Sequence, residues 1–183
     1  MKKIEIEIPD GKRAEWVNGV LTLVDEKPKD VTERIKTFIE AVKELGIEHP
    51  FVKEYRALCQ NNFHSTDAIA YLKLRIVCAA LNEGWQPKFT EDEWRYYPWF
   101  VLYTKTELEK MPDGDKKKLV IIDTGDYDTE YAGLAFAGSN DAPSFADTYI
   151  GSRLCLKSKE LSEYCGKQFS SLWADYLLRR KGE

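Results

Sequence analysis

The sequence predicts an α+β fold in which an antiparallel sheet packs against long helices, preceded by a three-stranded β-meander at the N-terminus. Three patterns support this prediction. Charged and apolar residues alternate in short runs over residues 3–24, which is the period of half-buried strands. Runs rich in aromatic and β-branched residues, typical of sheets, lie within residues 94–156. In residues 161–178 large apolar residues recur at spacings of three and four, as on one face of a helix.

Three short runs form the N-terminal meander: residues 3–8, 13–17 and 20–24. The first two are separated by Pro9-Asp10-Gly11 and the last two by Asn18-Gly19, the strongest short signal for a hairpin. Three short strands are only marginally stable alone, so one face is expected to pack against the helix that follows. We take residues 1–27 as an N-terminal β-meander module and residues 28–183 as the α+β core domain.

Three helices are expected next, each with recognisable end signals. Asp30 is suited to cap a first helix that runs to Gly46. Pro50 fits the first turn of a second, shorter helix. Ser65 or Thr66 caps a third helix whose apolar residues cover so much of its circumference that it is expected to be buried on more than one side.

The second half of the chain is expected to supply the main sheet. Residues 94–103 are predicted to form a strand, in which Pro98 requires an edge position or a bulge because proline donates no hydrogen bond. Residues 111–115 are predicted to form a hairpin-like turn. The remaining expected elements are strands at residues 119–122, 131–137 and 150–156, a loop at residues 138–147 and a closing helix at residues 161–178.

Composition and charge limit the kind of partner. The 183 residues suffice for one well-buried core with a small appended module. A net charge of −4 gives the surface as a whole no electrostatic footprint for nucleic acid. The four cysteines lack a paired CxxC spacing, which favours free thiols in a reducing compartment. The charged N-terminal residues do not fit a signal peptide and no window fits a membrane span, so a cytoplasmic protein without a membrane partner is expected.

The aromatic residues between positions 85 and 103 suggest a ligand-binding face. Alternate side chains of a strand leave on opposite faces, so the rings of residues 94–103 cannot all enter the core. One set is expected to form a partly exposed platform on which a base or another planar ligand stacks, with arginine or lysine meeting a phosphate. Core packing of most of these rings is the competing interpretation. The candidate ligand-binding residues are Trp85, Trp94, Arg95, Tyr97, Trp99, Arg153 and Lys157.

A run of carboxylates follows the strand at residues 119–122. Asp123, Asp126, Asp128 and Glu130 could converge on Ca²⁺ or Mg²⁺, because hard cations prefer oxygen ligands, although the spacing does not match an EF-hand. Asp123-Thr-Gly also has the local look of an aspartic-protease strand, but no convincing second segment of that kind follows. The competing interpretation is a solvated loop. No catalytic residue is assigned, and no cofactor is expected apart from such a cation.

Three motifs occur in order along the chain: Leu81-Asn-Glu-Gly-Trp-Gln-Pro87, Tyr96-Tyr-Pro-Trp-Phe100 and Gly151-Ser-Arg-Leu-Cys-Leu-Lys-Ser-Lys-Glu-Leu161. As a set they resemble a group of uncharacterised proteins from phages and prophages of gut anaerobes, from about Asp30 to the C-terminus. The resemblance implies an accessory viral gene product that acts in the host cytoplasm. Roles that fit such a product include binding DNA, sequestering a host nucleotide signal and forming part of a particle.

These features lead to three functional hypotheses. The first is a non-enzymatic binding module for a nucleotide or a single-stranded nucleic acid, recognised by the aromatic and basic residues. The second is a structural protein whose exposed aromatic residues form a homo-oligomer interface, since tryptophan, tyrosine and arginine are enriched there. The third is a metal-dependent hydrolase that uses the acidic loop at residues 123–130. We rank the hypotheses in this order and favour a protein that is not an enzyme.

Overall fold

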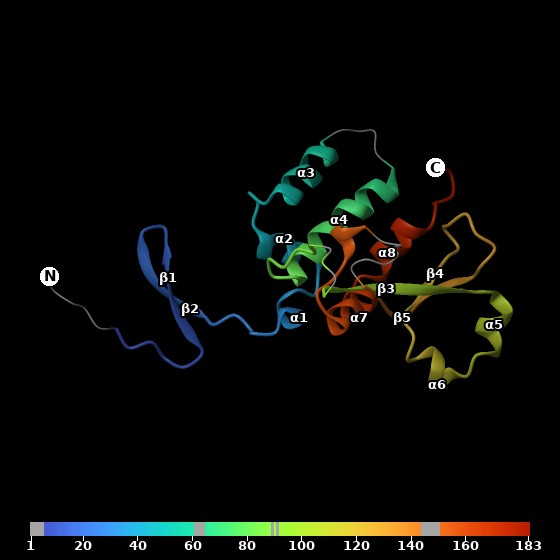
Figure 1. The fold of residues 1–183 in the computed structure, drawn as a ribbon, viewed down its shortest axis with the longest axis horizontal. Helices are drawn as coiled ribbons and strands as arrows, with labels where there is room; N and C mark the ends of the chain where they lie inside the picture. Colours follow the sequence, from blue (N-terminus) through green and yellow to red (C-terminus); the bar gives the residue numbers. More distant parts are fainter. Residues whose placement is uncertain (1–5, 61–64, 89, 91, 144–150) are drawn as a thin grey trace.

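Helix α4 (Thr66–Leu81) lies at the centre of the fold in this computed structural model. Helices α2 (Phe38–Leu45) and α3 (Pro50–Cys59) pack against α4, as does α8 (Ser170–Leu177), so α4 is covered on several sides as predicted (Figure 1). Helix α7 (Lys159–Gln168) covers one face of a three-stranded antiparallel sheet. The α+β class is confirmed. The structure describes residues 6–60, 65–88, 90, 92–143 and 151–183.

The helix predicted from Asp30 to Gly46 is two helices, which corrects the prediction. Asp30 does cap the first of them, α1 (Val31–Arg34), but the chain leaves the helix at Ile35 and re-enters it at α2. Tyr164 Oη lies 2.9 Å from the carbonyl oxygen of Thr32 and 2.7 Å from that of Ile35. In a continuous helix those carbonyls would accept from amides four residues later. A tertiary contact from α7 therefore accompanies the break.

The closing helix predicted at residues 161–178 is also interrupted. Phe169 has φ −113° and ψ 27°, and it separates α7 from α8. The two pieces pack against different partners, α7 against the sheet and α8 against α4. A straight helix could not follow both surfaces, so the predicted apolar face is divided between them. The single long helix predicted at this end of the chain is therefore not present, and α4, with sixteen residues, is longer than either α7 or α8.

The sheet consists of β3 (Trp94–Tyr103), β5 (Gly133–Pro143) and β4 (Ile121–Asp123), in that spatial order. Pro98 lies in β3, which is an edge strand, as predicted. The ladder shifts register at Trp99/Phe100 because β5 carries one extra residue there. At Gly138 of β5 a Cβ atom would come within 2.8 Å of Trp99 Nε1, so the glycine leaves room for this tryptophan to lie across the strand.

Three further predictions in this half are corrected. The strand expected at residues 131–137 continues to Pro143, so part of the expected loop at residues 138–147 is strand, and the rest from residue 144 lies outside the described residues. The turn expected at residues 111–115 instead leads into helix α6 (Asp113–Lys116), and another short helix, α5 (Lys105–Lys110), precedes it. In place of a strand at residues 150–156 the described part holds a 3₁₀ turn, η1 (Ser152–Leu154), and a bridge between Leu156 and Tyr96.

The N-terminal sheet has two strands rather than three, β1 (Lys12–Val17) and β2 (Val20–Asp25). Asn18 (φ 50°) and Gly19 (φ 80°) form the predicted turn between them. The backbone oxygen of Pro9 accepts from the amide of Lys12 at 3.1 Å. This turn leaves residues 6–8 outside any strand, while residues 1–5 lie outside the described part. The hairpin does not pack on the helix that follows but lies apart from the rest of the fold (Figure 1).

Two general predictions can be compared with this fold. All four cysteines are free thiols, with Cys78, Cys155 and Cys165 buried and Cys59 exposed. Across the described residues, the structure contains no helix with the length and apolar character needed to cross a membrane.

Candidate functional site

A cavity of about 590 Å³ opens at the C-terminal end of α4. The first turn of α3, the second half of α4, residues 82–87 and η1 form its walls. The residues that line it include two arginines and three ring-bearing side chains, together with the polar Asn82, Gln86 and Ser152: Arg75, Arg153, His49, Phe51 and Trp85. A volume of this size is typical of small-molecule sites.

Arg75 is the buried cation of this cavity. It is only 8% exposed, and its Nη1 donates to Glu54 at 2.8 Å. The guanidinium carbon lies 4.1 Å from the centre of the Phe51 ring, a cation–π contact that orients the group. Its Nε is buried without an acceptor among the described residues. A buried donor with no partner is costly, and the ion pair with Glu54 and the contact with Phe51 offset that cost.

His49 supplies a neutral donor at the start of α3. Its Nδ1 accepts from the amide of Phe51 at 3.2 Å, which leaves the proton on Nε2. Burial lowers the pKa of His49 below its ordinary value of 6.5, so the ring is uncharged at pH 7. Because the first turn of the ten-residue α3 lines the cavity, the positive end of its dipole also lies there.

The segment Asn82-Glu83-Gly84 shapes the opposite wall. Asn82 Nδ2 donates to the carbonyl of Cys155 at 2.9 Å, and Asn82 Oδ1 accepts from the amide of Lys157 at 3.0 Å. These bonds hold the segment that carries Arg153 beside the end of α4. Glu83 (φ 50°) and Gly84 (φ 87°) both adopt left-handed backbone angles, which turn the chain sharply before the half-buried Trp85. The LNEGW motif thus has a structural explanation at each of its polar positions.

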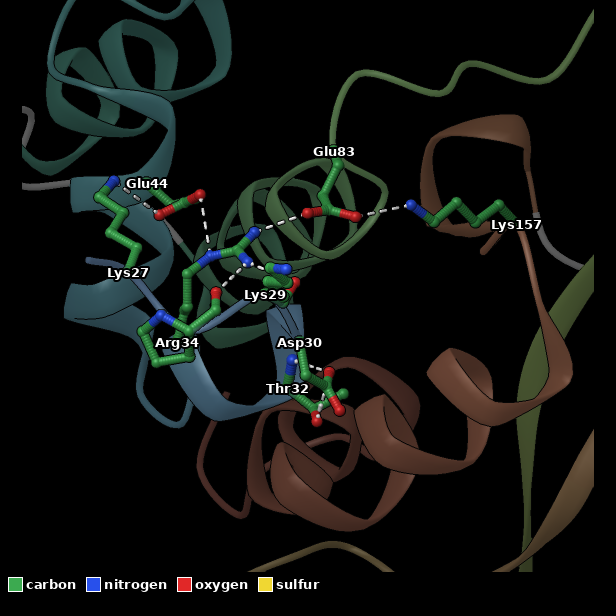
Figure 2. A network of polar contacts seen from close by, with 9 residues as sticks. Lys27, Lys29, Asp30, Thr32, Arg34, Glu44, Glu83 and Lys157 are labelled. Atoms are coloured by element: carbon green, nitrogen blue, oxygen red, sulfur yellow. Dashed lines mark hydrogen bonds and ion pairs between the residues drawn. The ribbon is translucent and has the colours of Figure 1, made fainter. Parts of the chain in front are cut away.

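Glu83 also joins three parts of the chain through ion pairs (Figure 2). Its two carboxylate oxygens lie 2.6 Å from Arg34 Nη2 and 2.9 Å from Lys157 Nζ. Hydrogen bonds from Lys157 and Arg34, together with their charges, hold the pKa of the Glu83 carboxyl below its ordinary value. Arg34 in turn pairs with Glu44 at 3.3 Å. The network therefore keeps Lys157 occupied away from the cavity.

The structure separates the predicted ligand-binding residues into three groups. Trp85 and Arg153 line the cavity together. Lys157 is paired with Glu83. Trp94 and Trp99 are 54% and 41% exposed on β3, whereas Arg95 and Tyr97 beside them are only 0% and 5% exposed. Arg95 is therefore not exposed on β3, whereas Tyr97 and Trp99 line an apolar cavity beside this strand. The three cavity residues that sequence reasoning missed are His49, Phe51 and Arg75, whose positions carry no motif.

The acidic loop is attached to the C-terminal residues of the chain. The amide of Asp128 donates to the carbonyl of Arg179 at 2.8 Å, and the amide of Lys181 donates to the carbonyl of Asp126 at 3.0 Å. The carboxylates of Asp123, Asp126, Asp128 and Glu130 are all on exposed residues. Within the part of the chain that the structure describes, no group of three or more potential metal ligands comes together.

Comparisons with protein families, with curated proteins and with solved structures find nothing that matches this chain.

Proposed function

We propose that the protein is a non-enzymatic binding module that holds a small nucleotide in the cavity between α3, α4 and η1. One observation carries this proposal. The cavity is lined by two arginines, a histidine and a tryptophan, and none of the described residues that line it is a carboxylate, although the chain has a net charge of −4. A concentration of donors and cations in an acidic protein favours an anionic ligand.

Four of the residues that line the cavity have roles that suit a nucleotide. Arg153 is exposed and forms no ion pair with a described residue, so its guanidinium can bind a phosphate in bidentate geometry. The first turn of α3 adds positive potential to the cavity, and the Arg75 guanidinium, whose charge is paired with Glu54, forms part of its polar wall. Trp85 offers a ring for a base to stack on. His49 Nε2 can donate to an oxygen of the ligand.

A small nucleotide fits better than a nucleic acid. A polyanion needs an extended basic surface, whereas Arg95 is buried and Lys157 is engaged with Glu83. The proposal gives the cavity no catalytic step: Nδ1 of His49 is occupied by the amide of Phe51, and no described carboxylate lines the cavity to orient the ring as a base. A phage or prophage accessory role in the cytoplasm, which the resemblance suggests, belongs to the same proposal.

The test is a thermal-shift screen with AMP, ADP, ATP and cyclic dinucleotides, followed by titration calorimetry on any nucleotide that raises the melting temperature. Arg153→Gln is expected to weaken binding about tenfold or more, because charged hydrogen bonds contribute roughly 1.5–3 kcal/mol. Trp85→Leu is expected to weaken binding by a similar factor, because stacking contributes about 1–3 kcal/mol per base.

Two matched variants serve as controls. Arg56→Gln removes an exposed arginine of α3 that does not line the cavity, and Trp94→Leu removes an exposed tryptophan of β3. Both are expected to bind the nucleotide like the unaltered protein. If no nucleotide shifts the melting temperature, or if Trp94→Leu abolishes binding while Trp85→Leu does not, the cavity is not the nucleotide site.

A further inference from the structure

The N-terminal hairpin has one apolar face that its own chain leaves uncovered. In the ladder, Trp16 pairs with Leu21 and Ala14 with Leu23, which places these four side chains on the same face. Trp16 is 74% exposed and Leu23 is 43% exposed. At the base of the hairpin Lys12 forms an ion pair with Asp25. A two-stranded hairpin is only marginally stable by itself in water, so packing of this face against another surface would stabilise it.

The hairpin is held away from the body of its own chain. Arg34 Nη1 donates to the carbonyls of Pro28 and Lys29 at 2.7 and 2.9 Å, which fixes the segment after the hairpin beside α1. The hairpin lies on one side of α1, and the sheet and α8 lie on the other (Figure 1). With that segment fixed, the hairpin remains free to reach another molecule.

A second unpartnered surface lies at the outer edge of β3. Tyr96 exchanges hydrogen bonds with Leu156 on that edge, at 3.0 and 2.8 Å. The alternation of the ladder then turns the N–H and C=O groups of Phe100 and Leu102 to the same side, where no described strand pairs with them. Such an edge is a template for another strand.

An apolar cavity of about 480 Å³ lies beside this edge, between β3 and the end of α8. Phe100, Leu102, Trp173 and Leu177 are among the residues that line it, and Leu177 is 46% exposed. Strand addition at β3 would continue the sheet and place one face of the added hairpin over this cavity. The hairpin offers an apolar face and the cavity accepts one, so the two surfaces match in chemistry.

We propose that the hairpin of a second copy of this chain pairs with the outer edge of β3 and covers the cavity, and that two copies exchange hairpins reciprocally. The area favours exchange over a contact between two hairpins. Strands of six residues form a face of roughly 20 Å by 10 Å, far below the roughly 800 Å² per partner of a stable interface. A contact between two hairpins would bury only these two faces, whereas reciprocal exchange also covers the two cavities and pairs the two β3 edges, so it buries more area.

The test is the oligomeric state of the full chain, measured by sedimentation velocity over a concentration series. The unaltered protein is expected to be a dimer. Trp16→Lys on the hairpin and Leu177→Arg at the cavity are each expected to weaken dimerisation about tenfold or more, the effect of removing an interface anchor. Val20→Lys lies on the opposite face of the hairpin and is expected to leave the dimer intact. Circular dichroism confirms that each variant is folded.

Mixing the two variants separates exchange from other dimers. Trp16→Lys keeps an intact cavity and Leu177→Arg keeps an intact hairpin, so the mixture can form one of the two contacts and is expected to regain a weaker heterodimer. A monomeric unaltered protein would overturn the proposal. So would a dimer that survives either single substitution, or a mixture that stays monomeric. Nucleotide binding by Trp16→Lys is expected to be unchanged, so the proposals for the cavity and for the hairpin fail independently.

Discussion

Glu83 connects three segments of the chain that are far apart in sequence. It follows the end of α4, and its carboxylate pairs with Arg34 of α1 and with Lys157 before α7 (Figure 2). Arg34 is also bonded to the backbone at residues 28 and 29. A single side chain thereby links the entry to the helical domain, the wall of the cavity and the C-terminal helices.

Glu83→Gln is expected to destabilise the fold by about 1 kcal/mol at pH 7, a value at the upper end for a pair that is partly exposed to solvent. The folded protein lowers the pKa of this carboxyl. Its contribution is therefore present above the unfolded value of about 4.5 and is lost as the pH falls through the lower folded value. Urea unfolding should show that the unaltered protein and the variant differ in free energy of unfolding at pH 7, and that this difference is smaller at pH 3.

Glu48→Gln is the matched control for this prediction. Glu48 also pairs with a lysine, at 2.6 Å, but its side chain is 80% exposed and it joins no larger network. No measurable change in unfolding free energy is expected. If Glu48→Gln and Glu83→Gln change the free energy of unfolding equally at both pH values, the network around Glu83 stabilises the fold no more than an isolated surface ion pair does.

The candidate site was predictable in part at the level of single residues. Trp85 and Arg153 could be proposed because tryptophan and arginine are the residue types that bind bases and phosphates. Arg75 could not, because inside an apolar helix it gives no sequence signal of which neighbours it will meet. His49 directly precedes Pro50 in the sequence, but its place in the same cavity as Arg75 follows from the packing of α3 on α4.

Helix α7 reaches the sheet so closely because Gly166 has no side chain. A Cβ atom at this position would lie 2.6 Å from Phe136 Cε2 and 2.7 Å from Pro98 Cβ. Real carbon atoms do not approach one another to such distances, so the sheet or the helix would have to move. The glycine thus sets the distance between α7 and two strands of the sheet.

Gly166→Ala is expected to destabilise the fold by about 1–3 kcal/mol through overpacking, even though alanine favours a helix over glycine. Gly114→Ala in α6 is the matched control, since a Cβ there meets nothing within 4 Å. It should leave stability unchanged or raise it by up to about 1 kcal/mol. Thermal and urea unfolding of both variants give the comparison. A neutral Gly166→Ala would mean that α7 does not pack on the sheet as described.

The ends of the helices were more predictable than their continuity. Asp30, Pro50 and Gly46 act at helix ends as their residue types suggest. Thr37 and Glu40 form a reciprocal capping box that restarts the helix in the middle of a continuous apolar pattern. Threonine followed three residues later by glutamate is the sequence signal for such a box, but the apolar periodicity that continues across it predicts a single helix. The hydrogen bonds from Tyr164 to the carbonyls at the break depend on the tertiary structure, so no local pattern predicts them.

Trp173 packs between the sheet and the helices. It is fully buried. Its ring centre lies 5.8 Å from that of Phe100 in β3 and 6.1 Å from that of Tyr176. Its Nε1 has no acceptor among the described residues. The main core therefore depends on this ring for its volume rather than for a hydrogen bond.

Trp173→Ala is expected to lower the free energy of unfolding by about 3–5 kcal/mol, the range for truncating a large aromatic core residue. Trp173→Phe should cost less, because it keeps an aromatic ring and removes the unpaired donor. Trp94→Ala truncates a half-exposed tryptophan and should change stability little. Equal effects of Trp173→Ala and Trp94→Ala in urea unfolding would contradict the burial of the C-terminal helices.

Interactions within a few residues determined what could be predicted from the chain alone. The Asn18-Gly19 turn, the cap at Asp30, the edge position of Pro98 and the α+β class all follow from local preference and periodicity. The separate domains at residues 1–27 and 28–183 stay a prediction.

Tertiary packing alone decided the rest. It broke two amphipathic helices so that each piece could follow a different surface, and it buried Arg95 and Tyr97 while leaving Trp94 exposed. It also assembled the cavity, whose residues come from positions as distant as 49 and 153. Periodicity and capping report on contacts along one element, whereas a cavity and an uncovered edge depend on which elements become neighbours, and no local pattern specifies that.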